Sequence, residues 1–128
     1  MRISEDNFVK KAEKAIVETN KKNGRDHLTT TQLRNIMAMA ADIYNDVMNE
    51  SDKVLSKEII GRVEYLKIRL LYDVGREQPK RTLKNFVTES ELLEVISEIG
   101  NSKKNFIMFY RYMEALVAYH KFYGGREM

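Results

Sequence analysis

Apolar residues recur every three to four positions along five stretches of the chain, a spacing that predicts helices and no strands. The stretches cover roughly residues 4–22, 31–48, 56–74, 83–99 and 103–123, with capping residues or glycines between them. Ser4 and the threonines at 29–31 suit helix starts, and Gly24 and Gly75 suit helix ends. Thr88 and Glu91 have the spacing of a capping box, which favours a break within the fourth stretch.

These stretches predict an all-α fold, a compact bundle of about five helices, in a single domain over residues 1–128. The pattern is thinnest in residues 1–27, a lysine-rich helix and loop whose narrow apolar stripe favours loose packing. A single proline and six glycines also favour long helices over a many-turned β fold.

The last stretch has apolar residues on two sides rather than one. The second side is formed by Tyr112, Ala115, Tyr119 and Phe122. A helix that is apolar on two sides is either central in a bundle or shared with a partner subunit. We therefore expect these four residues to form a subunit interface, with the central-helix alternative left open.

Composition indicates the class of protein and its cellular location but not its function. Hydrophobic residues make up 43% and charged residues 32%, as in soluble globular proteins, and the chain has no cysteine. The N-terminal residues contain no signal-peptide core and no window approaches a membrane span, so we expect a cytoplasmic protein without membrane contact.

Charge is unevenly distributed although the net charge is only +3. Residues 62–84 hold seven basic and three acidic side chains, and residues 85–99 hold four acidic and no basic ones. Such a basic field suits a polyanion, although both segments also fit ordinary solvated helix faces.

Catalytic chemistry has no support in the residues. His27 and His120 are far apart, and His120 lies on an apolar stripe, where a hydrogen-bonded core histidine is the better interpretation. Asp42 and Asp46 are one helical turn apart, but two carboxylates alone fit a solvated face better than a cation site. We expect no enzymatic activity, no metal and no cofactor.

The third stretch carries the clearest functional pattern. Arg62, Tyr65, Arg69, Tyr72 and Arg76 alternate at steps of three and four, so they share a helix face directed away from the apolar stripe. Arginine matches phosphate oxygens and tyrosine stacks on bases, which predicts RNA binding without sequence readout. In the opposing interpretation the tyrosines pack under neighbouring segments and the arginines are solvated or paired with nearby acids.

A basic, proline-containing connection follows directly, with Lys80, Arg81 and Lys84. Such a connection can follow a phosphate backbone beside the basic helix. These three residues and Arg62 are candidate RNA contacts on charge alone.

Three runs, residues 28–36, 65–76 and 105–125, resemble the small subunit of the type III-A CRISPR effector, the Csm complex. The resemblance covers about residues 28–125 and is most specific in the C-terminal run. It implies a helical bundle present in several copies that stack beside guide-binding backbone subunits and a large polymerase-like subunit, contacting guide RNA and target RNA. Carried over by position, Lys67, Arg69, Arg76 and Arg111 are the implied RNA contacts, with Arg34 a further candidate.

Overall fold

The computed structural model describes residues 1–77 and 79–124, and these residues form helices and no strand. The helices are α1 (Phe8–Asn23), α2 (Thr30–Met48), α3 (Lys57–Arg76), α4 (Thr82–Ser90), α5 (Leu92–Ser97) and α6 (Lys103–Phe122). The predicted all-α class is therefore confirmed, and the fourth predicted stretch is two helices rather than one.

Helix starts follow local side-chain chemistry. Thr29 and Gln32 form a capping box at α2, and Ser56 and Ser102 accept a backbone N–H at the starts of α3 and α6. Ser4 was expected to cap the first helix, but its carbonyl instead closes a turn before α1, which begins at Phe8.

Two helix ends differ from the sequence expectation. Gly75 lies inside α3, which continues to Arg76. The break between α4 and α5 falls at Glu91, whose backbone is left-handed with φ 56°, and Thr88 lies within α4 without capping α5. The predicted break is present, but a positive-φ residue makes it instead of a capping box.

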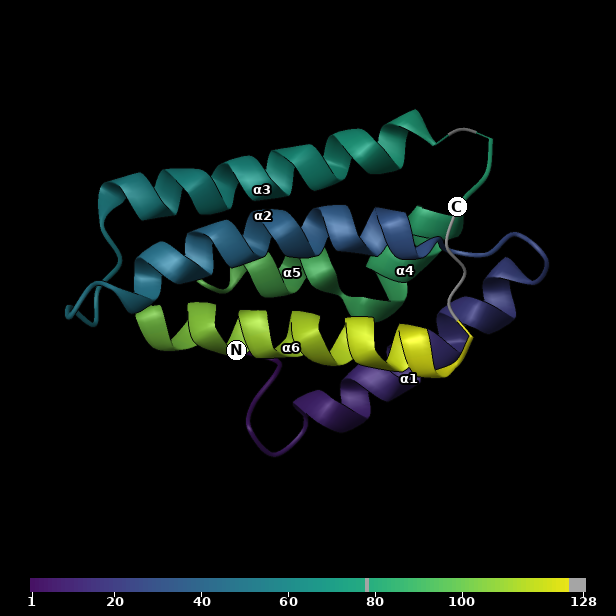
Figure 1. The fold of residues 1–128 in the computed structure, drawn as a ribbon, viewed down its shortest axis with the longest axis horizontal. Helices are drawn as coiled ribbons and strands as arrows, with labels where there is room; N and C mark the ends of the chain where they lie inside the picture. Colours follow the sequence, from purple (N-terminus) through teal and green to yellow (C-terminus); the bar gives the residue numbers. More distant parts are fainter. Residues whose placement is uncertain (78, 125–128) are drawn as a thin grey trace.

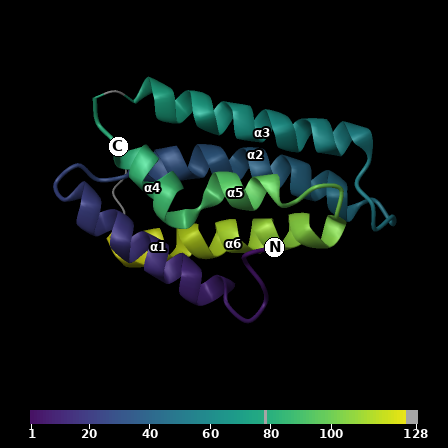
Figure 2. The ribbon, with the colours of Figure 1, turned by 180° about the vertical axis from the view of Figure 1, so that it is seen from behind.

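α6 is the centre of the bundle, with α1, α2 and α5 packed around it (Figures 1 and 2). Its ring-bearing core residues Phe106 and Phe109 are fully buried, and Tyr110 stacks on Tyr44 of α2 with ring centroids 4.0 Å apart. α1 packs against α4 and α6 through Ala12, Ala15 and Ile16. Because all three are buried, α1 packs closely, and the expected loose packing is wrong.

α3 lies at the outer edge of the molecule, antiparallel to α2 and with no other described element beyond it (Figures 1 and 2). Ile59, Val63, Leu66 and Leu70 are buried on its inner side. Ile60 and Val74 pack partly against the core, and the outer side of the helix, which includes Tyr65, Ile68 and Tyr72, faces solvent.

Both ends of α3 are tied to the bundle. Before it, the backbone N–H of Leu55 donates to the carbonyl oxygen of Asn101 at 2.8 Å. After it, the Glu77 carboxylate accepts from Gln32 Nε2 at 2.8 Å and from the backbone N–H of Leu83 at 2.7 Å. One carboxylate thus joins the end of α3 to the starts of α2 and α4.

Candidate nucleic-acid interface

The two tyrosines of the predicted basic face point into solvent. Tyr65 is 58% exposed and Tyr72 is 61% exposed, so neither packs under a neighbouring segment. The guanidinium of Arg76 lies over the Tyr72 ring, 5.7 Å from its centroid. This geometry holds a cation and an aromatic face together at the surface, a combination that suits phosphate and base contact.

The three arginines of this face each have an acidic neighbour. Arg69 Nε lies 3.4 Å and Arg76 Nη2 3.7 Å from the same Asp73 oxygen, and Arg62 Nη1 lies 2.5 Å from Asp46 on α2. The opposing interpretation is therefore correct for the arginines, which are paired, and wrong for the tyrosines, which are exposed. Exposed ion pairs of this kind contribute about 0.2–1 kcal/mol each, so a phosphate can replace the carboxylate at little cost.

The basic connection follows the end of α3 along the chain. Arg81 and Lys84 are exposed, and Lys80 Nζ lies 3.9 Å from Asp26. Residue 78, within this predicted connection, lies outside the described residues. We use the name α3 basic face for the three α3 arginines together with these three residues, which follow them in the chain: Arg62, Arg69, Arg76, Lys80, Arg81 and Lys84.

Lys67 and Arg34 lie away from the α3 basic face. Lys67 is on the opposite flank of α3, where its ammonium donates to the Ser97 hydroxyl at 2.6 Å. Arg34 is exposed on α2, on a different side of that helix from Asn35 and Met39, which border α3. The structure therefore does not bring these two predicted contacts into the same surface.

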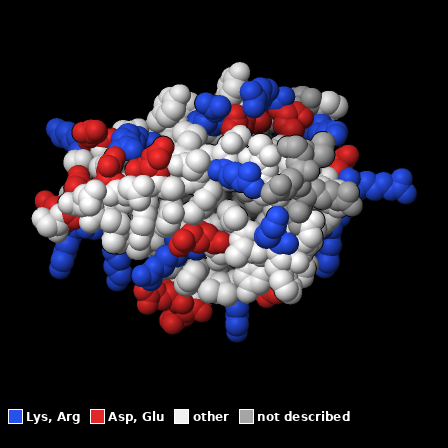
Figure 3. All heavy atoms as spheres, in the orientation of Figure 1, with Lys and Arg blue, Asp and Glu red and all other residues white. Residues whose placement is uncertain are grey.

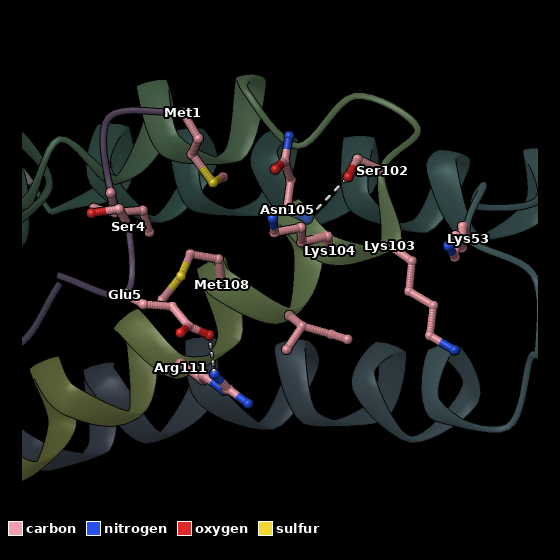
Figure 4. A pocket seen from close by; sticks show the side chains of 12 residues that line it. Met1, Ser4, Glu5, Lys53, Ser102, Lys103, Lys104, Asn105, Met108 and Arg111 are labelled. Atoms are coloured by element: carbon pink, nitrogen blue, oxygen red, sulfur yellow. Dashed lines mark hydrogen bonds and ion pairs between the residues drawn. The ribbon is translucent and has the colours of Figure 1, made fainter. Parts of the chain in front are cut away.

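Arg111 belongs to a second basic region, an open hollow of 930 Å³ between the N-terminal segment and the start of α6. Four cationic side chains line it, namely Lys53, Lys103, Lys104 and Arg111, with Glu5 the one acidic residue of the lining. Figure 4 shows Arg111 directed at Glu5, and their charged atoms lie 3.1 Å apart. The hollow lies beside α6 and separate from the α3 basic face.

In Figure 3 blue and red side chains alternate along the edge where α3 lies, and the middle of the visible face carries few charges. The α3 edge is therefore charged but locally compensated, as its ion pairs indicate.

The four residues of α6 that were predicted to form a subunit interface do not share one exposed surface. Tyr112 is buried, because α1 packs on this side of α6, and its hydroxyl donates to the carbonyl oxygen of Ser90 in α4 at 2.8 Å. Its assignment to an interface is wrong for that reason. Ala115 and Tyr119 are half-buried, and Phe122 is 77% exposed, so only the C-terminal end of the stripe is open.

The two buried ionisable side chains of α6, His120 and Tyr112, are hydrogen-bonded parts of the core. His120 is buried and its Nε2 lies 2.7 Å from the carbonyl oxygen of Leu28, which confirms the prediction of a hydrogen-bonded core histidine. Burial lowers the pKa of His120, and burial raises the pKa of the Tyr112 hydroxyl. Among the described residues no group of three or more His, Cys, Asp or Glu side chains could hold a metal ion.

Sequence reasoning missed three features of these surfaces. Ile68 and Leu71 are large apolar residues on the open face of α3, and Lys53 completes the basic hollow. Extending the helical spacing from Tyr65 and Tyr72 would have placed Ile68 between them. Nothing in the sequence places the loop residue Lys53 beside α6.

No helix in the described part of the chain is long and apolar enough to span a membrane.

The family model described as Csm2 Type III-A matches residues 4–126. The chain is 38% identical over 127 residues to the "CRISPR system Cms protein Csm2" of Mycobacterium tuberculosis, covering 99% of each. It is also 36% identical over 126 residues to the protein of that name from Streptococcus thermophilus (98% of each), and 37% identical over 127 residues to the one from Enterococcus italicus (91% of this chain, 87% of the relative). The predicted resemblance is therefore confirmed, and the chain belongs to the Csm2 family of type III-A CRISPR systems.

Proposed function

We propose that this chain is a non-catalytic small subunit that contacts the RNA backbone in the effector complex through the α3 basic face, without reading sequence. The observation that carries the proposal is the open face of α3, where Tyr65 and Tyr72 are exposed beside the three arginines. Arg62, Arg69 and Arg76 are seven residues apart, so they recur every ~10.5 Å along one side of the helix. A regular row of cations at an exposed edge suits the repeating phosphates of a strand.

The wider role follows from family membership. Several copies would stack beside guide-binding backbone subunits and the large polymerase-like subunit, with guide RNA and target RNA as the ligands, in cytoplasmic antiviral and anti-plasmid defence. RNA cleavage and nucleotide polymerisation would then belong to other subunits.

The test is RNA binding by the full chain, measured by fluorescence anisotropy with labelled single-stranded RNA over a range of salt concentrations. Each lost phosphate contact lowers the dependence of log K on log salt by roughly 0.7. The double variant Arg69→Ala/Arg76→Ala is therefore expected to flatten the slope by about 1.4 while the helical circular dichroism spectrum is unchanged. Lys10→Ala/Lys14→Ala on α1 removes the same charge elsewhere and is the matched control.

Substitution of Asp73 is expected to change RNA affinity in the opposite direction. Its carboxylate pairs with both Arg69 and Arg76, so Asp73→Asn frees both guanidinium groups for phosphate and is expected to tighten RNA binding. Asp6→Asn changes the net charge equally on a distant exposed residue. If the two variants tighten binding equally, or if the double arginine variant keeps its salt slope, the α3 assignment is incorrect.

An alternative function is an assembly subunit whose RNA contact is incidental. The exposed Phe122 at the end of α6 favours it, because this ring packs edge-on against Tyr123 at 5.1 Å and otherwise faces solvent. In that case Phe122→Glu would remove the chain from the co-purified complex while the isolated chain keeps its RNA affinity. The interpretation fails if Phe122→Glu co-purifies at the level of the unaltered chain.

A further inference from the structure

The open hollow beside the start of α6 joins an apolar floor to a cationic rim, and we call it the basic hollow. Its apolar lining comes from four residues, of which the second and the last are buried: Met1, Ile3, Ile107 and Met108. Its four cationic side chains face a single carboxylate, that of Glu5, so the lining carries an excess of positive charge. An apolar floor with a few charged groups around it is the usual composition of a binding site.

The backbone holds two of these cations together. Lys53 lies in the loop before α3 and Lys103 begins α6, and the backbone N–H of Lys103 donates to the carbonyl oxygen of Lys53 at 3.0 Å. The Lys103 ammonium donates to the carbonyl oxygen of Glu50. Within the described part of the chain, no carboxylate forms an ion pair with Lys53, Lys103 or Lys104. Like charges repel one another, so an anion bound among these lysines relieves a repulsion that the chain itself leaves in place.

The N-terminal segment of the chain shows how such an anion can lie in the basic hollow. Ile3 is buried there, and two residues later the Glu5 carboxylate lies 3.1 Å from Nη1 of Arg111. Figure 4 shows Glu5 and Arg111 at one end of the hollow and Lys53 at the other. One apolar side chain and one carboxylate of an irregular segment therefore already occupy one end, and the other end presents its lysines to solvent.

The lining favours a protein ligand over RNA. No aromatic side chain is among the described residues that line the basic hollow, whereas α3 presents Tyr65 and Tyr72 beside its arginines. Proteins that bind single-stranded RNA use aromatic rings to stack the bases. Methionine side chains, here Met1 and Met108, are flexible and adapt to the apolar side chains of a peptide.

We propose that the basic hollow binds an acidic segment of a different protein, in which carboxylates alternate with apolar side chains. Lys104, Ile107 and Arg111 follow one another at steps of three and four on one side of α6, in the order cation, apolar residue, cation. The two cations are ~10.5 Å apart along the helix, about the length of three residues of extended chain. This assignment makes Arg111 a protein contact, whereas the family resemblance implies an RNA contact for it.

The acidic segment of this chain itself, residues 85–99, does not fit as the ligand. Glu89 pairs with Lys22. Glu91 and Glu98 both pair with Arg2, whose Nε lies 3.0 Å from Glu98 Oε2. Because three of the four carboxylates in this segment are occupied within the chain, the ligand comes from another protein.

The first test is peptide binding by the full chain, measured by fluorescence anisotropy with a labelled synthetic peptide of alternating glutamate and leucine. Charge reversal in Lys53→Glu/Lys104→Glu is expected to weaken binding about tenfold, and Lys10→Glu/Lys14→Glu on α1 is the matched control that leaves it unchanged. Peptides with glutamine for glutamate, or with serine for leucine, are each expected to bind several-fold more weakly. The proposal is refuted if the glutamate–leucine peptide does not bind, if the three peptides bind alike, or if the two double variants lose the same affinity.

Substitution of Glu5 is expected to tighten peptide binding. Its carboxylate lies on Arg111, so Glu5→Gln removes a competing carboxylate and frees the guanidinium for the peptide, with a several-fold gain in affinity. Asp6→Asn changes the net charge equally at the next residue, which is not among the described residues of the lining, and is the matched control. Equal affinity in these two variants overturns the assignment of Arg111 to the peptide site.

RNA binding separates this inference from the proposed function, on which it does not rest. Arg69→Ala/Arg76→Ala is expected to keep the peptide affinity, and Lys53→Glu/Lys104→Glu is expected to keep the salt dependence of RNA binding. If the lysine variant instead flattens that dependence and binds the peptide normally, the basic hollow is an RNA surface and the inference is wrong. Should the arginine variant keep its RNA salt slope while the lysine variant loses the peptide, the proposed function fails and the inference stands.

Discussion

α6 and α3 are both 20 residues long and both carry aromatic residues at helical spacing, yet the bundle uses them in opposite ways. α6 has neighbours on most sides and buries Tyr112, whereas α3 has α2, α4 and α5 on its inner side only and exposes Tyr65 and Tyr72. Identical residue types thus contribute to the core in one helix and to an open surface in the other. The number of sides that neighbours cover, more than the residue type, decides what an aromatic residue does.

The largest expected effect on stability comes from truncating one aromatic side chain in each helix. Phe109→Ala in α6 creates a cavity at a fully buried position and is expected to lower the free energy of unfolding by about 3–5 kcal/mol. Tyr72→Ala in α3 is expected to change it by no more than about 0.5 kcal/mol. Urea unfolding followed by circular dichroism measures both. Similar losses in the two variants would break the comparison.

A smaller effect is expected from removing one hydroxyl group in each helix. Tyr112→Phe leaves the carbonyl oxygen of Ser90 without its buried donor and is expected to cost about 1–2 kcal/mol. Tyr65→Phe removes a hydroxyl at the exposed surface and is expected to have almost no effect on unfolding. Should the two substitutions cost the same, the Tyr112 hydrogen bond contributes nothing to stability.

The smallest effect is a pH dependence that originates in α6. Burial lowers the pKa of His120 in the folded chain, and in the unfolded chain a histidine pKa is about 6.5. Below that pH the unfolded chain binds a proton that the folded chain does not. The stabilisation present above about pH 6.5 is therefore lost progressively as the pH falls through the lower folded pKa.

Urea unfolding at several pH values, with two histidine variants, measures this dependence. His120→Gln is expected to remove the histidine component of the acid destabilisation. His27→Gln changes an exposed loop residue and is the matched control. An unaltered pH profile in His120→Gln would exclude His120 as its source.

Much of the fold could be predicted because helix starts depend on nearby residues. Thr29, Ser56 and Ser102 act within three residues of their own position, so the sequence contains the whole interaction. The left-handed backbone at Glu91 could not be predicted, because a non-glycine residue adopts it only where the packing of α4 and α5 requires it.

The sequence predicts which side of its helix a candidate residue occupies, but it does not predict which neighbouring helices cover that side. Helical spacing correctly directs Arg62, Arg69 and Arg76 to one open side of α3, and the resemblance supplies Lys67 and Arg111 without a location. Whether Tyr112 is covered depends on α1 and on Ser90 of α4, which are distant in sequence. Tertiary contacts of that kind leave no local pattern, which is why the α6 stripe was assigned to an interface.

The ties at both ends of α3 determine how this helix can take part in association. Exchange of α3 between two copies would require breaking the backbone hydrogen bond at Leu55 and the three-helix junction at Glu77 together. Domain swapping needs a hinge that opens at low cost, and neither end provides one. α3 is therefore expected to keep its place in the bundle and to contact a ligand as a preformed surface, without either of its ends detaching.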